Sequence, residues 1–75
     1  MSGRRVRLRF DAALYSGRAV RQVAADFAEV AVVRITADRR GLVVSLQPRV
    51  AIGPDRLGDV FANHVLARTV EALRR

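Results

Sequence analysis

The segment Arg5–Phe10 alternates strictly between arginine and apolar side chains. A period of two residues is typical of a β-strand with one buried face and one solvated face. The segment therefore predicts an opening strand whose apolar side must be covered by other elements. That apolar side consists of Val6, Leu8 and Phe10, and the other side of Arg5, Arg7 and Arg9. The preceding residues, Met1–Gly3, have nothing to pack against and are expected to fray.

A helix is predicted next, after a short turn. Asp11 is expected to end the strand, and the turn to place Leu14 and Tyr15 on the core. Ser16 is a suitable N-cap, because its hydroxyl can accept a hydrogen bond from a free backbone N–H of the first helical turn. From about Gly17 to Glu29, apolar residues recur at the three-and-four spacing of one helical face. That face consists of Val20, Val23, Ala24 and Phe27. The polar residues expected to pair on its solvent side are Arg18, Gln22 and Asp26.

Two further strands follow as a hairpin. Alternation predicts one strand over about Ala31–Ala37 and another over Leu42–Gln47, which Pro48 ends because proline lacks a backbone donor. The connecting turn is Asp38–Gly41, in which Gly41 is expected to take a left-handed conformation. The inward side chains of the two strands would be Val33, Ile35, Ala37, Leu42, Val44 and Leu46.

The chain continues with a loop and a second helix. The loop Arg49–Gly53 should cover apolar surface with Val50 and Ile52, and the helix should begin at Pro54 and run to Arg75. The apolar arc of this helix is wider than one sheet face needs. Part of the arc is a candidate surface for contact with another protein chain, although we favour its burial by the small domain itself. That part consists of Leu66, Val70 and Leu73.

The order strand, helix, strand, strand, helix predicts one small α+β domain of the βαββα type over residues 1–75. The two hairpin strands are antiparallel, whereas the first two strands are joined through a helix and should be parallel, following a right-handed crossover. Both conditions hold when the third strand lies between the other two. This arrangement is the split βαβ unit, with strand order 1-3-2. Both helices then cover one face of the sheet and leave the other uncovered.

The uncovered face is the main candidate binding surface. Folding does not require three arginines along one strand, because like charges there repel one another. An arginine-lined face suits an acidic, extended partner, since the guanidinium group binds carboxylate or phosphate through two parallel hydrogen bonds. The candidate residues are Arg5, Arg7, Arg9, Arg34, Ser45 and Gln47. An ordinary solvated face is the competing interpretation: all 14 basic residues are arginine, which is typical of a coding bias that places arginine on any surface.

Composition restricts the class of protein. With 51% hydrophobic and 28% charged residues, the chain is too apolar for a disordered protein and too interrupted by charge for a membrane protein. No apolar run reaches membrane-spanning length, and the N-terminus lacks the order of a secretory signal, so we expect a cytoplasmic location and no membrane partner. The net charge of +7 favours acidic partners.

No catalytic or metal-binding pattern stands out. The chain has no cysteine and a single histidine, His64, so thiolate ligands and histidine clusters are excluded as metal sites of this chain. Nucleophile motifs and phosphate-binding glycine loops are missing from the sequence. His64 falls on the polar side of the last predicted helix, and Asp26 and Glu29 on the solvated side of the first. We therefore expect neither a cofactor nor enzyme activity.

Three groups of residues, in order along most of the chain, carry a family resemblance. They are Phe10-Asp11-x-x-Leu14-Tyr15-Ser16, then Ala19-Val20 with Ala24-x-Asp26-Phe27, and Phe61-x-Asn63-x-x-Leu66. The polar members Asp11, Ser16 and Asn63 are the most telling, because burial does not require them. The chain resembles the HxsD family of small His-Xaa-Ser system proteins. The strongly basic first strand departs from that family's pattern.

The resemblance implies an accessory role. HxsD-like proteins accompany radical S-adenosylmethionine enzymes and a short repeat-bearing substrate in systems thought to modify peptides. It suggests a non-catalytic protein that binds the precursor peptide, the modifying enzyme or both. Strand addition at an exposed sheet edge, that of the first or the second strand, would suit such binding.

Two alternatives stay open. One is a structural homodimer that buries the last helix or the uncovered face. The other is a nucleic-acid-binding module, in which the arginines would meet phosphates. The uncovered face has no aromatic side chain on which bases could stack, and this disfavours the second alternative.

Overall fold

The computed structural model describes residues 5–74, and Met1–Gly3, which were expected to fray, lie outside this range. The elements are β1 (Val6–Asp11), α1 (Gly17–Asp26), β2 (Ala31–Ala37), β3 (Gly41–Pro48) and α2 (Pro54–Leu73). The predicted βαββα order is confirmed. β2 has the predicted bounds, whereas β1 is shifted by one residue so that it includes Asp11, which was expected to end it. β3 extends by one residue at each end, and α1 is shorter than predicted. α2 ends at Leu73, before the predicted end at Arg75.

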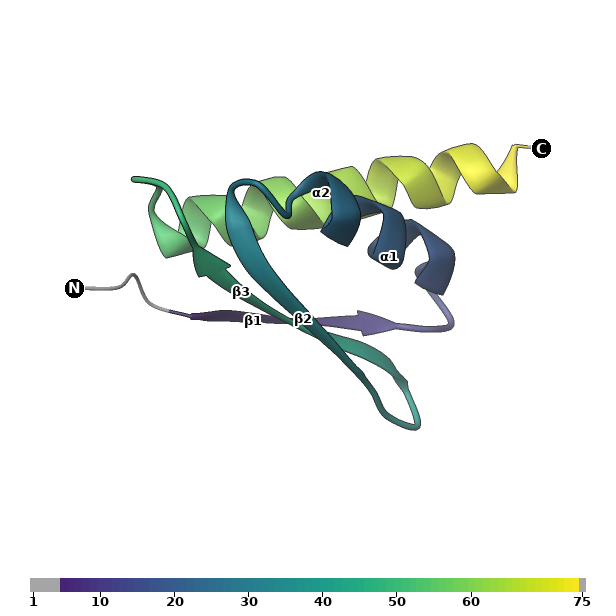
Figure 1. Ribbon diagram of the computed structural model, residues 1–75. Helices are drawn as coiled ribbons and strands as arrows, with labels where there is room; N and C mark the ends of the chain where they lie inside the picture. The colour runs from purple at the N-terminus through teal and green to yellow at the C-terminus, as the bar shows by residue number, and fades with distance from the viewer. Residues whose placement is uncertain (1–4, 75) are drawn as a thin grey trace.

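The three strands form one sheet with the predicted order β1-β3-β2 (Figure 1). β3 pairs antiparallel with both neighbours, so β1 and β2 run parallel to each other on its two sides. In this register Ser45 of β3 lies between Arg7 of β1 and Arg34 of β2. The next row across the sheet consists of Arg9, Val43 and Thr36. The register thus lines up side chains of all three strands on the face that bears the arginines.

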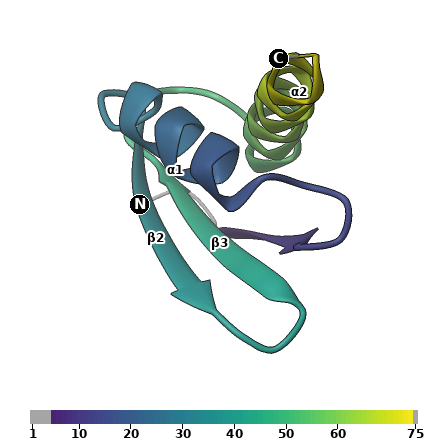
Figure 2. The ribbon, with the colours of Figure 1, turned by 90° about the vertical axis from the view of Figure 1, so that its right-hand side faces the viewer.

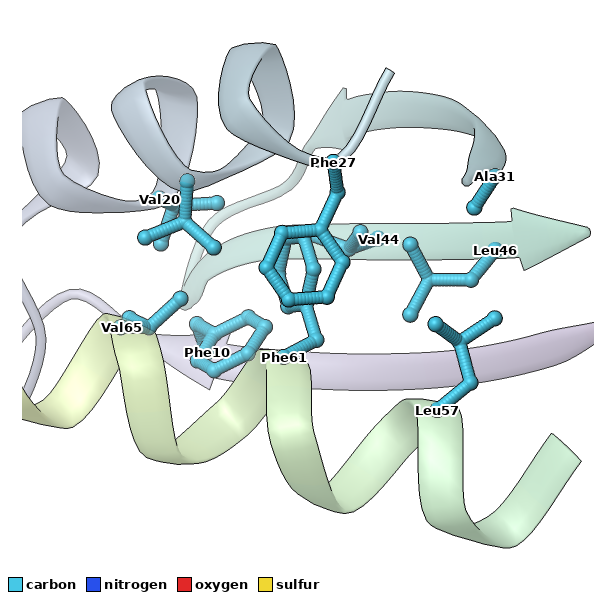
Figure 3. Packing of buried hydrophobic residues seen from close by; sticks show 10 residues of the cluster. Phe10, Val20, Phe27, Ala31, Val44, Leu46, Leu57, Phe61 and Val65 are labelled. Carbon is cyan, nitrogen blue, oxygen red and sulfur yellow. The ribbon is translucent and has the colours of Figure 1, made fainter. Parts of the chain in front are cut away.

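Both helices lie on the other face of the sheet, as predicted (Figure 2). The core between helices and sheet contains buried apolar residues from all five elements and from the turn after α1. At its centre the ring of Phe61 on α2 lies 5.1 Å from the ring of Phe27 and 6.0 Å from that of Phe10, measured between centroids (Figure 3). The cluster consists of Phe10, Val20, Val23, Phe27, Ala31, Val44, Leu46, Leu57, Phe61 and Val65. This shared core confirms the α+β fold class.

Local hydrogen bonds set the limits of α1. Ser16 is its N-cap, as predicted, because the Ser16 Oγ accepts a hydrogen bond from the backbone N–H of Ala19 at 3.2 Å. The helix stops before Phe27, although the apolar spacing continues. The carbonyl oxygen of Phe27 accepts hydrogen bonds from the backbone N–H groups of both Val30 and Ala31. The chain therefore reverses at this point and enters β2.

Three apolar residues that were expected to point inward are exposed instead, and the first is Ala37, which lies at the end of β2 beyond the core. Leu14 is 70% exposed, because the turn closes on Asp11, whose carbonyl oxygen accepts from the N–H groups of both Leu14 and Tyr15, and only Tyr15 is brought onto the core. Val50 is also exposed: the backbone N–H of Ile52 bonds to the Val50 carbonyl oxygen in a tight turn, and only Ile52 packs against the core. Neither helix within residues 5–74 combines the length and the hydropathy needed to cross a membrane.

Asp38 holds the turn between β2 and β3. Its Oδ1 accepts hydrogen bonds from the backbone N–H groups of Arg40 at 2.8 Å and Gly41 at 3.1 Å, and its Oδ2 pairs with a guanidinium nitrogen of Arg9 at 2.8 Å. The Arg40 N–H, together with the Gly41 N–H and the charge of Arg9, lowers the pKa of Asp38 below its ordinary value of 3.8. Gly41 has a φ of +155°, which is positive but not the predicted left-handed turn conformation, because Gly41 already belongs to β3.

We expect the Asp38 contacts to stabilise the fold only while the carboxylate is charged. Because the folded-state pKa is lowered, this contribution is present above about pH 4 and disappears as the pH falls through the lower folded-state value. Asp38→Asn should therefore melt below the wild type at about pH 5, and the difference should shrink towards about pH 2. Thermal melts of both proteins across this range measure the difference. A difference that is constant with pH would contradict the role of the charge.

Candidate functional site

The side of the sheet opposite the helices, called the open face below, carries the predicted binding residues. Arg5, Arg7, Arg9 and Arg34 are all exposed there, and Ser45 and Gln47 are half-buried. An open depression of about 410 Å³ lies on this face across all three strands. Its lining consists of Arg5, Arg7, Arg34, Thr36, Val43 and Ser45. The structure therefore brings four of the six predicted residues together.

The row Arg7, Ser45 and Arg34 forms the floor of this depression. The two arginines belong to the outer strands, and Ser45 lies between them on the central strand. Since neighbouring strands lie about 4.8 Å apart, the Cα atoms of Arg7 and Arg34 are about 10 Å apart. Long arginine side chains can converge across such a distance, so both guanidinium groups can reach one acidic group above the Ser45 hydroxyl. The lining contains no acidic side chain that would compete.

The other two predicted residues are placed differently. Arg9 forms the salt bridge with Asp38 in the hairpin turn, which partly neutralises its charge, and it lines a smaller neighbouring hollow of about 250 Å³. Gln47 lies opposite Val32 and lines neither hollow. Arg9 and Gln47 therefore flank the depression.

Sequence reasoning missed two lining residues, Thr36 and Val43. Alternation had placed both on this side of their strands, but only the register shows that they stand in one row with Arg9, beside the row of Ser45. They add a hydroxyl group and an apolar patch to the depression. A ligand of mixed character, with an acidic group and some apolar surface, fits this lining.

The predicted helix surface of Leu66, Val70 and Leu73 is exposed, by 49%, 40% and 81%. The expectation that the domain itself buries these residues is wrong. α2 extends past the end of the sheet, and Thr69, which accepts a hydrogen bond from the Ser16 backbone N–H through its Oγ1 at 3.3 Å, is the last buried residue of the helix. The three residues form a stripe at helical spacing along the end of α2.

Arg68 of α2 binds the polar residues that were expected to pair within α1. One of its guanidinium nitrogens lies 2.6 Å from Asp26 Oδ2, and the other donates to Gln22 Oε1 at 3.5 Å. A hollow of about 360 Å³ beside these contacts has Arg18, Arg68 and Glu71 in its lining. Because its charges are mixed and Arg68 is already paired, this hollow is less suited to an acidic ligand than the open face.

Over residues 5–74, no three His, Cys, Asp or Glu side chains gather closely enough to hold a metal ion. His64 is exposed, with its ring edge-on to Phe27 at a centroid distance of 5.4 Å. The open face is therefore the best-defined candidate site.

No family model, curated protein or solved structure matches this chain. The interpretation of the open face therefore rests on its own chemistry. The depression offers guanidinium groups and hydroxyls without an acidic or aromatic side chain in its lining. Such a surface binds carboxylates or phosphates through charge-assisted hydrogen bonds.

Proposed function

We propose that this protein is a non-catalytic accessory of a peptide-modification system, which binds an acidic, extended segment of the precursor peptide or of the radical S-adenosylmethionine enzyme on its open face. The chemistry of the open face supports the binding mode, and the resemblance to HxsD-like proteins supports the biological setting. A cytoplasmic location belongs to the same proposal.

The observation that carries the proposal is the row Arg7, Ser45 and Arg34. Two arginines from different strands flank one hydroxyl group, and all three side chains line a depression that contains no acidic side chain. A carboxylate held there would receive charge-assisted hydrogen bonds from both arginines. Since Arg5 also lines the depression, two residues before Arg7 along the chain, an extended peptide can place successive acidic groups beside these arginines.

Nucleic acid is the second ligand class that an arginine-rich face suggests. Proteins that bind single strands usually stack bases on aromatic side chains. All four aromatic residues of this chain belong to or pack against the core on the other side of the sheet: Phe10, Tyr15, Phe27 and Phe61. The open face therefore favours a peptide carboxylate over a nucleic acid.

The decisive experiment is a binding titration with overlapping synthetic fragments of a candidate precursor peptide. We expect one acidic fragment to bind, and Arg34→Glu to weaken its binding by at least about tenfold, since a charge-assisted hydrogen bond is lost and a repulsion is gained. Arg56→Glu is the matched control, because it changes the net charge equally on an exposed position of α2. Fluorescence anisotropy of the labelled fragment measures both affinities.

Three outcomes would contradict the proposal. Equal weakening by Arg34→Glu and Arg56→Glu would mean that only net charge attracts the peptide. Tighter binding of single-stranded DNA, with a steep loss of affinity at rising salt, would favour the nucleic-acid interpretation. A dimeric mass in solution that does not change with any fragment would favour a structural homodimer through the exposed stripe of Leu66, Val70 and Leu73.

A further inference from the structure

Two backbone hydrogen bonds fix which residues of β1 turn their main-chain groups outward. The N–H of Ala12 donates to the carbonyl oxygen of Arg40 at 2.7 Å, and the N–H of Asp38 donates to that of Gly41 at 2.9 Å. Hydrogen-bonded and non-hydrogen-bonded pairs alternate along an antiparallel ladder. Counted back from the Ala12 and Arg40 pair in the observed register, the residues of β1 that bond to β3 are Phe10, Leu8 and Val6.

The remaining residues of β1 direct their N–H and C=O groups to the outer edge of the sheet. Within the strand these residues are Arg7, Arg9 and Asp11, and the carbonyl oxygen of Asp11 is already bonded within the turn. Arg7 and Arg9 therefore each combine an outward main-chain donor and acceptor with a guanidinium group on the open face. A strand that pairs with this edge would place its side chains about 4.5–5.5 Å from those of Arg7 and Arg9.

The other side of the same edge is apolar. Val6 and Leu8 are only half-buried, although α2 lies directly over them. Gly58 makes this close packing possible, since a Cβ at that position would lie 3.1 Å from Val6 Cγ1 and 3.6 Å from Leu8 Cδ2. A strand added here would thus meet arginine with every second side chain and apolar surface with the others.

The outer edge of β2 offers a weaker combination. The Asp38 and Gly41 bond, counted back in the same way, leaves Val33, Ile35 and Ala37 with outward main-chain groups, and their side chains lie on the side of the sheet that faces the helices. The arginine of β2, Arg34, turns its main chain inward to β3. Only the edge of β1 therefore unites free backbone groups with arginine side chains in the same residues.

A second copy of the chain is disfavoured as the occupant of this edge. Antiparallel pairing of two β1 edges about a twofold axis would place arginine opposite arginine, for example Arg7 opposite its own copy. Like charges at directly opposite positions destabilise a sheet. The charge of the edge therefore disfavours self-pairing and favours a partner of opposite sign.

We propose that an extended segment of the partner adds to the outer edge of β1 as a fourth strand, with acidic residues beside Arg7 and Arg9 and apolar residues between them against Val6 and Leu8. This inference rests on the proposed function and deepens it. It names the edge, the main-chain bonding and an alternating acidic and apolar pattern in the ligand.

The test uses the full chain and a peptide of about eight residues that alternates glutamate and valine. A peptide of the same composition with its glutamates and valines in two blocks is the control ligand. We expect the alternating peptide to bind at least about tenfold more tightly, and amide hydrogen exchange of Arg7 and Arg9 to slow when it binds. Equal affinity of the two peptides, with unchanged exchange at both amides, would overturn strand addition.

Two variants of one residue separate the main chain from the side chain. Arg7→Thr removes the guanidinium group and keeps the N–H, whereas Arg7→Pro removes both without losing a bond to β3, because proline is tolerated at an outward edge position. We expect Arg7→Pro to bind the alternating peptide about tenfold more weakly than Arg7→Thr does. Ala37→Pro, at an outward position of β2, should bind like the wild type. Equal binding by Arg7→Pro and Arg7→Thr would count against a fourth strand.

The two levels of the proposal fail differently. If acidic peptides bind and their binding depends on Arg34, but the amides of Arg7 and Arg9 stay unprotected, binding on the open face is supported and the addition of a fourth strand is contradicted. If acidic peptides of either arrangement fail to bind, both proposals fall. Circular dichroism of each variant verifies folding, and the exchange measurement on the wild-type protein decides the question if Arg7→Pro does not fold.

Discussion

Phe61→Ala is expected to lower the free energy of unfolding by about 3–5 kcal/mol. The side chain is completely buried, and its ring contacts those of Phe10 and Phe27, which come from β1 and from the turn after α1. Truncation leaves a cavity between α2, β1 and the turn after α1. Because other contacts fix each of these segments, the core cannot collapse to fill the cavity. A chain of 75 residues has roughly 4–11 kcal/mol of total stability. Urea unfolding followed by circular dichroism should therefore show a large shift to lower urea.

Leu66→Ala is the matched control for this variant. Leu66 lies on the same helix but is 49% exposed, so its truncation should change the free energy of unfolding by less than about 1 kcal/mol. If both variants unfold at the same urea concentration, Phe61 does not form the centre of the core.

Gly41→Ala is expected to destabilise the protein by about 2–4 kcal/mol. The φ of Gly41 is +155°, which side-chain-bearing residues rarely adopt. A Cβ at this position would also collide with the carbonyl oxygen of Phe10 and lie 2.7 Å from the backbone nitrogen of Ala12. The strain cannot be relieved by a rotamer change, because both contacts are with the backbone of β1 and its turn. The melting temperature should fall by roughly 4–8 °C for each kcal/mol lost.

Gly17→Ala provides the comparison for Gly41→Ala. Gly17 is the first residue of α1, and the nearest atom to an added Cβ would be Leu42 Cδ1 at an ordinary distance of 3.8 Å. Alanine favours the helix over glycine by up to about 1 kcal/mol, so this variant should melt at or slightly above the wild-type temperature. If Gly41→Ala melts no lower than Gly17→Ala, the backbone of β1 must shift to accommodate the added methyl group, and the predicted strain is contradicted.

The helices and strands and their order could be predicted because apolar residues recur with a period of two in strands and of about 3.6 in helices. The alternation of Ala31–Ala37 is bounded by turn residues on its C-terminal side, and its limits in the structure are those of the prediction. The strand order followed from two directions: the hairpin strands had to be antiparallel, and the two strands joined through a helix had to be parallel. The exposure of Leu14 could not be predicted, because it depends on how the turn closes on the carbonyl oxygen of Asp11. The end of α1 could not be predicted either, because the apolar spacing continues past it and only the hydrogen bonds to Phe27 show where the chain turns.

The candidate site was predictable in part. Alternation identified the side of each strand that bears Arg7, Arg34 and Ser45, and the strand order placed those sides on one face. Their alignment in a single row depends on register, which a sequence pattern of period two does not define to the residue. The same is true of Arg9, whose pairing with Asp38 requires the hairpin turn to lie beside the end of β1.

The sequence by itself determined the kind and order of the elements, the apolar side of each strand and the positive charge of the uncovered side. These properties follow from the periodicity and composition of each segment and do not depend on its contacts with other segments. The tertiary structure decided which arginines are already paired, namely Arg9 and Arg68, and which remain available on the open face. It also decided that the outward backbone groups of β1 include those of Arg7 and Arg9. Both depend on contacts between segments that are distant in the chain, and only register and packing bring such segments together.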